Sequence, residues 1–166
     1  MYKFYPASLN DIPTIQDIAH KTFFKTYQKI VGLKQLEWMF DWMYSTPSLT
    51  EQMSTGHNFF LLHEDDIPVG FISIQRTDTE VFCFQKIYLL PSSHGQGLGR
   101  KLLDLGFAYV KGFNLKNPRI ELHVNRENKA LKFYQHIGFE IASQGDYEVH
   151  PGYFMNDYIM AIHPFN

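Results

Sequence analysis

Residues 87–103 of the chain, IYLLPSSHGQGLGRKLL, decide the fold that we expect. An apolar strand ends at Pro91, a helix follows, and the loop between them carries glycines at three alternate positions, Gly95, Gly97 and Gly99. Glycine lets a backbone turn tightly and come close to a ligand. The first amides of a helix lack intrahelical partners and lie at the positive end of its dipole. The segment therefore predicts an anion site, most naturally for a phosphate or pyrophosphate, with Arg100 and Lys101 beside it.

Two other phosphate-binding loops fit this segment less well. A P-loop places Lys and then Ser or Thr after its last glycine, and no glycine of this chain precedes such a pair. A dinucleotide-binding loop has the spacing G-x-G-x-x-G in a βαβ unit, whereas here single residues separate the glycines and an antiparallel meander is expected before them. A loop that binds nothing is the third alternative, but three glycines at a helix start lower local stability without structural gain.

The remaining sequence predicts one mixed α/β domain over residues 1–166. Helical spacing of apolar residues indicates helices, the first of them preceded by a capping box at Ser8–Asp11, and alternating or short apolar runs indicate strands. We expect Ser45–Ser48 to break the chain after the second helix and Gly138 to end the last one. The expected helices cover about 12–27, 33–44, 97–113 and 128–136, and the expected strands cover 2–7, 58–62, 69–74, 81–90, 119–124, 141–143 and 153–162.

Composition and charge exclude several classes of protein. The chain is 45% hydrophobic and 16% aromatic with a net charge of −2, so it can build a core and lacks the basic excess of a general nucleic-acid binder. Its single cysteine, Cys83, excludes an internal disulfide and a cysteine-based zinc site, and we expect no metal. No apolar run reaches the roughly 18 residues that span a membrane. Because Met1–Pro6 also lacks the apolar stretch of a signal peptide, we expect a cytoplasmic protein.

Two motifs resemble those of one enzyme family. The glycine loop is similar to the acetyl-CoA pyrophosphate loop Gln/Arg-x-x-Gly-x-Gly/Ala of the GNAT superfamily of N-acetyltransferases, with His94 in place of the usual Gln or Arg. The second motif is similar to that family's run of Asn, Ala, Phe or Leu, Tyr, Gly and Phe, and consists of Asn128, Ala130, Phe133, Tyr134, Gly138 and Phe139. The resemblance implies a GNAT-type fold over nearly the whole chain. That fold is a mixed, mostly antiparallel sheet flanked by helices, with strands splayed at the cofactor site.

The resemblance also implies a set of residues that bind acetyl-CoA. The pantetheine arm would pair with free backbone groups of Ile87 and Leu89 at the splayed strand, with Leu90 at its exit. Asn128 would hydrogen-bond the cofactor, with help from Asn125. The pyrophosphate would take amides from His94, Gly95, Gly97, Gly99 and Arg100.

Tyr134 matches the general acid that is usual in this family. A neutral amine attacks the thioester carbonyl and coenzyme A leaves as a thiolate, which a phenol within reach can protonate. A base is needed as well, because an alkyl amine is mostly protonated at pH 7 and reaching the neutral form costs about 4 kcal/mol. Some members use a Glu on the strand before the loop, where this chain has Gln85, while Glu121 and His123 lie on the next expected strand. We assign no base from the sequence.

The acceptor is expected to be a primary amine that contacts the first two helices and the last hairpin. Residues 22–27 (TFFKTY) and 156–160 (NDYIM) look like the PaiA-like branch, whose members acetylate polyamines such as spermidine and spermine. Acidic residues that could attract a cationic amine are Glu37, Asp41, Glu51, Asp146, Glu148 and Asp157. Amino-acid, peptide and protein amines stay open as acceptors, and the resemblance allows a homodimer. A non-catalytic acyl-CoA-binding domain and a different nucleotide-phosphate binder are the competing functions.

Overall fold

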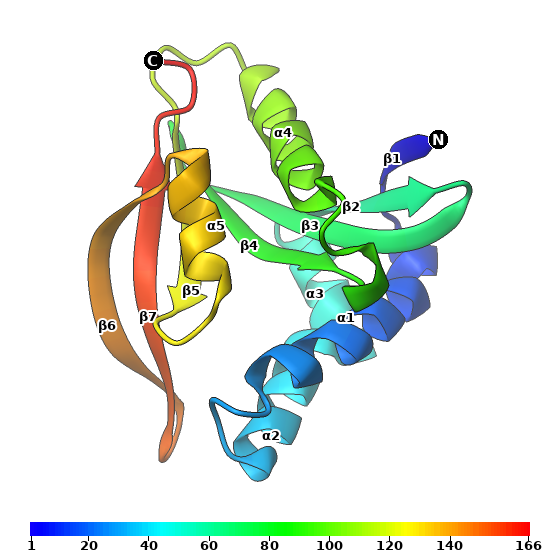
Figure 1. Ribbon diagram of the computed structural model, residues 1–166, viewed down its shortest axis with the longest axis vertical. Coiled ribbons are helices and arrows are strands. Elements are labelled where there is room, and N and C mark those ends of the chain that lie inside the picture. Colours follow the sequence, from blue (N-terminus) through cyan, green and yellow to red (C-terminus); the bar gives the residue numbers. More distant parts are fainter.

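The computed structural model describes residues 1–166 and contains one seven-stranded sheet with helices on both faces (Figure 1). The strand order is β1-β2-β3-β4-β5-β7-β6, and every neighbouring pair is antiparallel except β4 with β5. The strands are β1 (Tyr2–Pro6), β2 (His57–Glu64), β3 (Ile67–Asp78), β4 (Val81–Leu89), β5 (Arg119–Asn125), β6 (Glu140–His150) and β7 (Tyr153–Ile162). This architecture confirms the expected mixed, mostly antiparallel fold class.

Five α-helices form the outer layers. They are α1 (Ile12–Tyr27), α2 (Leu33–Tyr44), α3 (Thr46–Ser54), α4 (Leu98–Lys111) and α5 (Ala130–Ile137). Helices α1 to α3 cover one face of the sheet and α4 and α5 cover the other, as Figure 1 shows. None of these helices is both long and apolar enough to cross a membrane.

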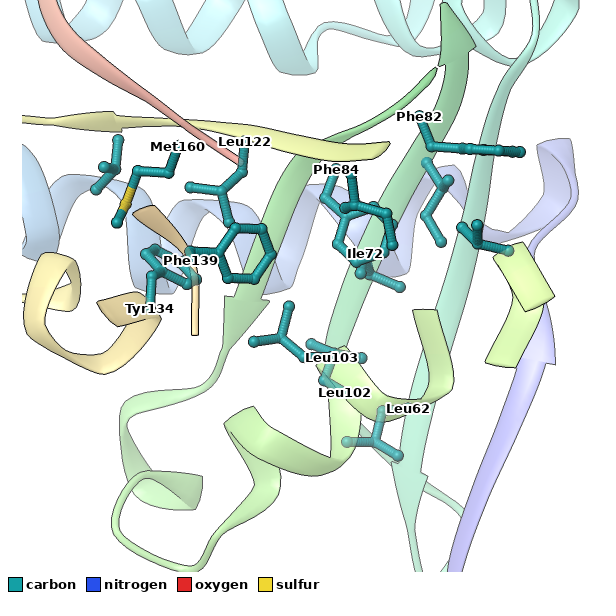
Figure 2. Close-up of a cluster of buried hydrophobic side chains, with 14 of the residues drawn as sticks. Leu62, Ile72, Phe82, Phe84, Leu102, Leu103, Leu122, Tyr134, Phe139 and Met160 are labelled. Atoms are coloured by element: carbon teal, nitrogen blue, oxygen red, sulfur yellow. The ribbon is translucent and has the colours of Figure 1, made fainter. Parts of the chain in front are cut away.

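Each face of the sheet has its own hydrophobic core. The core under α4 and α5 joins Leu102 and Leu103 to Ile72, Phe84 and other sheet residues, and Tyr134 and Phe139 close it at the α5 end (Figure 2). The core under α1 to α3 contains Phe23, Tyr44 and Phe71. The alternation of side chains along a strand therefore assigns each β-residue to one face or the other.

A β-bulge in β4 changes that alternation in mid-strand. Ser73 of β3 pairs with Lys86, but the next residue, Ile74, pairs with Phe84, so Gln85 is the extra residue. Phe84 packs under α4, whereas Lys86 faces α2 and α3 on the other side. A bulge bends its strand and increases the local twist, which helps β4 to diverge from its other neighbour, β5.

The structure differs most from the sequence-based expectations in two elements, and strand β3 is also longer than the expected 69–74. Residues 45–48 do not simply break the chain: Ser45 caps a third helix, α3, by accepting a hydrogen bond from the Ser48 amide, and Pro47 occupies its first turn. Strand β6 runs from Glu140 to His150 instead of stopping at Ser143, although its residues are mostly exposed. The long pairing with β7 supplies the order that the polar sequence of β6 does not indicate.

Gly106 provides a test of the packing between α4 and the sheet. A Cβ at this position would lie 2.8 Å from Cζ of Phe84 and 3.1 Å from Cδ1 of Ile72. Overpacking a core costs about 1–3 kcal/mol, which exceeds the roughly 1 kcal/mol that alanine gains over glycine in a helix. We therefore expect Gly106→Ala to lower the free energy of unfolding by on the order of 1 kcal/mol in urea denaturation.

Gly32→Ala is the matched control for Gly106→Ala. Gly32 is the N-cap of α2 with φ −65°, and no atom lies within 4 Å of the added Cβ, so this variant should lose only the smaller amount by which alanine is a poorer N-cap than glycine. Equal stability of the two variants would contradict the close approach of α4 to the sheet.

Candidate active site

The site begins where β4 and β5 separate. These strands pair only between Val81–Cys83 and Arg119–Glu121, although β4 continues to Leu89 and β5 to Asn125. Figure 1 shows the two strands diverging beyond this point. Unpaired backbone groups along such a gap are available to an inserted ligand.

Backbone hydrogen bonds show which residues of β4 face the gap. The Leu90 amide donates to the carbonyl of Val69 on β3 at 2.8 Å, so this amide is not free to bind a ligand. Alternation along the strand then directs the backbone groups of Tyr88 toward β3 as well, and those of Ile87 and Leu89 toward the gap. The structure thus brings the backbone groups of Ile87 and Leu89 to the splayed edge. The amide of Leu90 is bound to β3, and its side chain packs beside the core under α1 to α3.

The loop after β4 presents a row of free amides. The amides of Ser93 and His94 donate to Leu90 and Pro91, and the amide of Lys101 donates to Gly97 at 3.1 Å. Between them, the amides of residues 95–100 make no hydrogen bond within the protein. The last of these belong to the N-terminus of α4, where the helix dipole favours an anion.

Two glycines shape this loop, and their surroundings fit a bulky anion. Gly95 and Gly97 have φ of +78° and +73°, in the left-handed region that favours glycine. A Cβ on either residue would meet no atom within 4 Å, so the space in front of the loop is open. Gly99 has a different role: its Cβ would lie 3.1 Å from Cζ of Phe133, so the missing side chain lets α4 approach α5. The row of amides around an open left-handed turn fits a pyrophosphate group.

The two charged or polar side chains predicted for this loop bind within the protein. Nε2 of His94 donates to the carbonyl oxygen of Leu89 at 3.0 Å, which ties the loop back to the end of β4. Nε of Arg100 donates to Oδ1 of Asp104 at 3.0 Å, one turn later on α4. Nζ of Lys101 lies 4.7 Å from the ring centroid of Tyr2, so the backbone amides are the groups of this loop that the structure leaves without a partner.

Tyr134 lies on α5 at the edge of the core next to the gap. Its side chain is 9% exposed, and its hydroxyl makes no hydrogen bond in the structure. Burial, followed by the nearby Tyr27 hydroxyl, raises the pKa of Tyr134 well above its ordinary value. The phenol therefore keeps its proton at neutral pH, which a general acid requires.

The two predicted asparagines shape the turn between β5 and α5. Oδ1 of Asn125 accepts from the Glu127 amide at 2.9 Å, and Oδ1 of Asn128 accepts from the Ala130 amide at 2.9 Å. Only one residue separates Asn128 from Ala130, so the asparagine lies in the turn before α5. Both side chains retain their amide Nδ2 groups as donors near the gap.

The opposite side of the gap is lined by tyrosines from the layer of α1 to α3. Tyr27 of α1 and Tyr88 of β4 pack beside that core with Tyr44 of α2. Burial raises the pKa of Tyr88, and the hydroxyls of Tyr44 and Tyr27 add to the effect, so these phenols lie close together. Tyr27, which packs beside the core under α1 to α3, also adds to the raised pKa of Tyr134 on the other face of the sheet.

An aromatic contact joins α2 to the β6–β7 hairpin and bounds this side of the site. The ring of Trp38 lies 4.6 Å from that of His150 and 5.9 Å from that of Tyr153, measured between centroids. Nε2 of Gln35 also donates to the carbonyl of Phe154 at 2.8 Å. The second helix and the last hairpin, two of the elements expected on the acceptor side, thus meet.

Of the six acidic residues that the sequence offered for the acceptor, the structure buries one. Asp157 of β7 is 3% exposed, whereas the other five are exposed to solvent. Asp146 is paired with Arg126, and Glu148 accepts from the Gly152 amide in the hairpin turn. His123 of β5 is exposed on the same side of the sheet, and Glu121 is paired with Arg119 at 3.0 Å.

Two hollows on the protein surface lie away from these residues. One is lined by the end of α4 and the approach to β5, including Val110, Leu115 and Phe165, and the other by Gly138, Ile141 and Ala161 among others. Neither includes a predicted site residue. The candidate site is therefore defined by unpaired backbone groups and side chains along the β4–β5 gap.

Lys86 is a buried amine that the sequence did not single out. It is 9% exposed, and its Nζ donates to Oε1 of Gln52 at 2.6 Å and lies 5.8 Å from the ring centroid of Tyr44. No carboxylate pairs with it, and burial lowers the pKa of Lys86 to about 8. The pKa of His57 is lowered mainly by burial and further by the nearby charge of Lys86.

The pKa of Lys86 predicts a rise of stability with pH. Because the folded-state pKa is lower than that of the unfolded chain, the unfolded chain binds more protons between these values, and the free energy of unfolding increases with pH. Comparing Lys86→Met with the wild type cancels the other titrating groups. The stability of the wild type relative to this variant should increase by about 2 kcal/mol between about pH 7.5 and about pH 9.5 in urea denaturation. A difference that stays constant over this range would contradict the buried, unpaired state of Lys86.

Comparisons with known proteins bear on this arrangement. Residues 55–141, just over half of the chain, match the acetyltransferase (GNAT) domain family. The chain belongs to this family. Membership confirms the predicted class, an acetyl-CoA-dependent N-acetyltransferase domain with acetyl-CoA as its cofactor.

Individual relatives and solved structures agree with this family. An uncharacterized N-acetyltransferase of Methanocaldococcus jannaschii is 30% identical over 141 residues, which cover 80% of this chain and 56% of that protein. The PaiA N-acetyltransferase of Thermoplasma acidophilum, solved in complex with coenzyme A, has a TM-score of 0.81 at 21% identity and covers 98% of this chain and 99% of its own. Mutant forms of the spermidine/spermine N-acetyltransferase SpeG of Vibrio cholerae have a TM-score of 0.70 at 18% identity, covering 98% and 94%.

Proposed function

We propose that the protein transfers the acetyl group of acetyl-CoA to a small primary alkyl amine by direct attack of the amine. The observation that carries this proposal is the row of free amides at residues 95–100, which opens beside the unpaired edge of β4. An anion site and a splayed strand at adjacent positions suit a ligand with a diphosphate and an amide-bearing arm. We also propose that the chain acts as one domain, in the cytoplasm and without a nucleic-acid partner.

Acetyl-CoA would be held mainly by backbone groups of this chain. Ile87 and Leu89 would pair with the pantetheine arm across the gap, and the amides of Gly95 to Arg100 would surround the pyrophosphate. The His94 side chain binds the carbonyl oxygen of Leu89, so the Leu89 amide is the group that would pair with this arm. Asn125 and Asn128 would donate from their Nδ2 groups, because their Oδ1 atoms are engaged in the turn.

Tyr134 would act as the general acid. When bound, acetyl-CoA supplies an acetyl thioester whose sulfur departs as a thiolate. Tyr134 holds a proton on a hydroxyl that has no hydrogen-bond partner in the protein, and Ile87 and Leu89 pack against the same core as its ring. Proton donation from this hydroxyl to the sulfur would complete the cleavage of the C–S bond.

A polyamine is the acceptor that we propose. The likeness to PaiA and to a spermidine/spermine N-acetyltransferase supports this class, since 98% of the chain superposes on each of them. The buried carboxylate of Asp157 and the tyrosines on the same side of the sheet suit a cationic alkyl amine. Amino acids, peptides and protein amines are the alternatives.

The acceptor can be identified by following thiol release from acetyl-CoA with a panel of amines. The panel contains spermidine, spermine, putrescine, single amino acids, and a lysine-containing peptide with a free or blocked N-terminus. We expect release with the polyamines. Release with an amino acid or a peptide alone would keep the enzyme class and reject the polyamine acceptor, and failure to bind acetyl-CoA in calorimetric titration would reject the assignment of the loop.

A further inference from the structure

The buried carboxylate of Asp157 has no partner in the protein. It is 3% exposed, yet it makes neither a hydrogen bond nor an ion pair. An unpaired charge in such surroundings costs stability, so buried carboxylates are normally paired or neutral. Arg126 lies nearby but is paired with Asp146. The protein thus holds an almost fully buried acidic group that none of its own residues pairs.

The strand register places Asp157 in the sheet, on the side where the acceptor is expected. It lies opposite Asn125 of β5, beyond the point where β4 leaves β5. Met160 of β7 faces α4 and α5, and alternation therefore directs Asp157 and Met155 toward α1 and α2. The side chain consequently points to the face from which Tyr27 approaches the gap.

A glycine on β6 helps to shield this carboxylate from water. Gly145 lies opposite Asp157 in the β6–β7 register. The ring of Tyr147 leans along β6 over this glycine, so a Cβ on Gly145 would lie only 2.6 Å from Cζ of Tyr147. An aromatic ring therefore covers the position next to Asp157, and His123 lies 6.2 Å from that ring between centroids.

We propose, on the basis of the proposed acetyl transfer, that Asp157 receives the ammonium group of the acceptor and removes its proton. This inference names a base for the reaction and makes the acceptor a protonated primary alkyl amine. Two neighbours lower the pKa of this carboxyl, His123 from β5 and Arg126 from the following turn, and the carboxylate in turn raises the pKa of the Tyr27 hydroxyl from α1. Burial raises the pKa of Asp157 and outweighs the opposite effects of His123 and Arg126, which makes the carboxylate a stronger base than an exposed aspartate.

The proton transfers balance between two residues on opposite sides of the gap. Asp157 takes one proton from the ammonium and leaves a neutral amine, and later releases that proton to solvent. The nitrogen lone pair forms the C–N bond as the C–S bond breaks. Tyr134 gives its proton to the departing sulfur and regains one from the nitrogen, so the products are the acetamide, the thiol and one proton. The hydroxyl of Tyr27 adds to the raised pKa of Tyr134, and Asp157 adds to the raised pKa of Tyr27.

The variant Asp157→Asn tests this inference because it keeps the shape of the side chain and removes the base. With a polyamine as acceptor, kcat/KM should fall by about 10²-fold or more, and its dependence on pH at the acid limb should disappear. With trifluoroethylamine, a weakly basic amine that is neutral at the assay pH, the loss should be much smaller. Acetyl-CoA affinity should not change, and the melting temperature should stay the same or rise, because a buried unpaired charge is removed.

Asp78→Asn is the matched control, since Asp78 is exposed at the end of β3, outside the proposed site, and forms no ion pair, and it should leave kcat/KM unchanged. Equal losses with both amines in Asp157→Asn, or a lower melting temperature, would show a structural role and overturn the inference. Unchanged kcat/KM would overturn it as well. Failure of the wild type to acetylate any amine would instead overturn the proposed function, so the two failures are distinguishable.

Discussion

Replacing Tyr134 by phenylalanine should lower turnover by roughly 10²-fold, the usual range for removing a general acid. The affinity for acetyl-CoA should stay near that of the wild type, because this hydroxyl binds nothing in the protein and the ring that packs against Phe139 remains. Stability should not fall either, since no hydrogen bond is lost and no buried group is left unpaired. The measurement is steady-state thiol release together with calorimetric titration of acetyl-CoA.

Tyr109→Phe is the matched control for this variant. Tyr109 lies on α4, packs against Phe60 and Phe113, and is remote from the gap, so its replacement should leave turnover unchanged. Unchanged turnover in Tyr134→Phe would mean that water or another group protonates the thiolate. A loss of acetyl-CoA affinity equal to the loss of turnover would assign Tyr134 to binding instead of proton transfer.

Replacing Gly97 by valine should weaken acetyl-CoA binding at least about tenfold, or about 1.4 kcal/mol. Valine is strained at a φ of +73°, and its side chain would enter the open space in front of the free amides, where the pyrophosphate is proposed to lie. Because no protein atom lies within 4 Å of the new Cβ, the variant should still fold. Calorimetric titration on folded protein measures the effect.

Gly152→Val separates loss of the anion site from backbone strain. Gly152, in the turn between β6 and β7, has φ of +81° and no atom within 4 Å of its Cβ, so it should lose a similar amount of stability. Its affinity for acetyl-CoA should not change. If Gly97→Val binds acetyl-CoA as tightly as Gly152→Val does, the loop does not hold the pyrophosphate.

Much of the fold could be predicted because local signals agreed with the final packing. The second helix was predicted with its observed bounds, since its apolar stripe and Pro47 both marked its limits. Helix α3 was not predicted, because Pro47 was interpreted as the end of α2. A proline that ends one helix is equally suited to the first turn of the next. Strand β6 was underestimated because its order comes from pairing with β7, which no local pattern shows.

The site was predictable where it depends on backbone conformation and not where it depends on distant contacts. The alternating glycines indicated the loop, whose amides the structure leaves free. The sequence could not distinguish Asp157 from five other acidic residues, because only the register with Asn125 and Gly145 places it in the interior. Alternation along β7 indicated only its face, since Met160 and Asp157 lie an odd number of residues apart and face opposite sides of the sheet.

The central claim, direct acetyl transfer to an amine, is tested most directly by mass spectrometry of a complete reaction. Wild-type protein is mixed with acetyl-CoA labelled in the acetyl group and with spermidine, and acetylated amine and free coenzyme A are quantified together. We predict labelled N-acetylspermidine and free coenzyme A in equal amounts, with no acetyl group left on the protein. Free coenzyme A accompanied only by acetate, or label retained on the chain, would contradict the account.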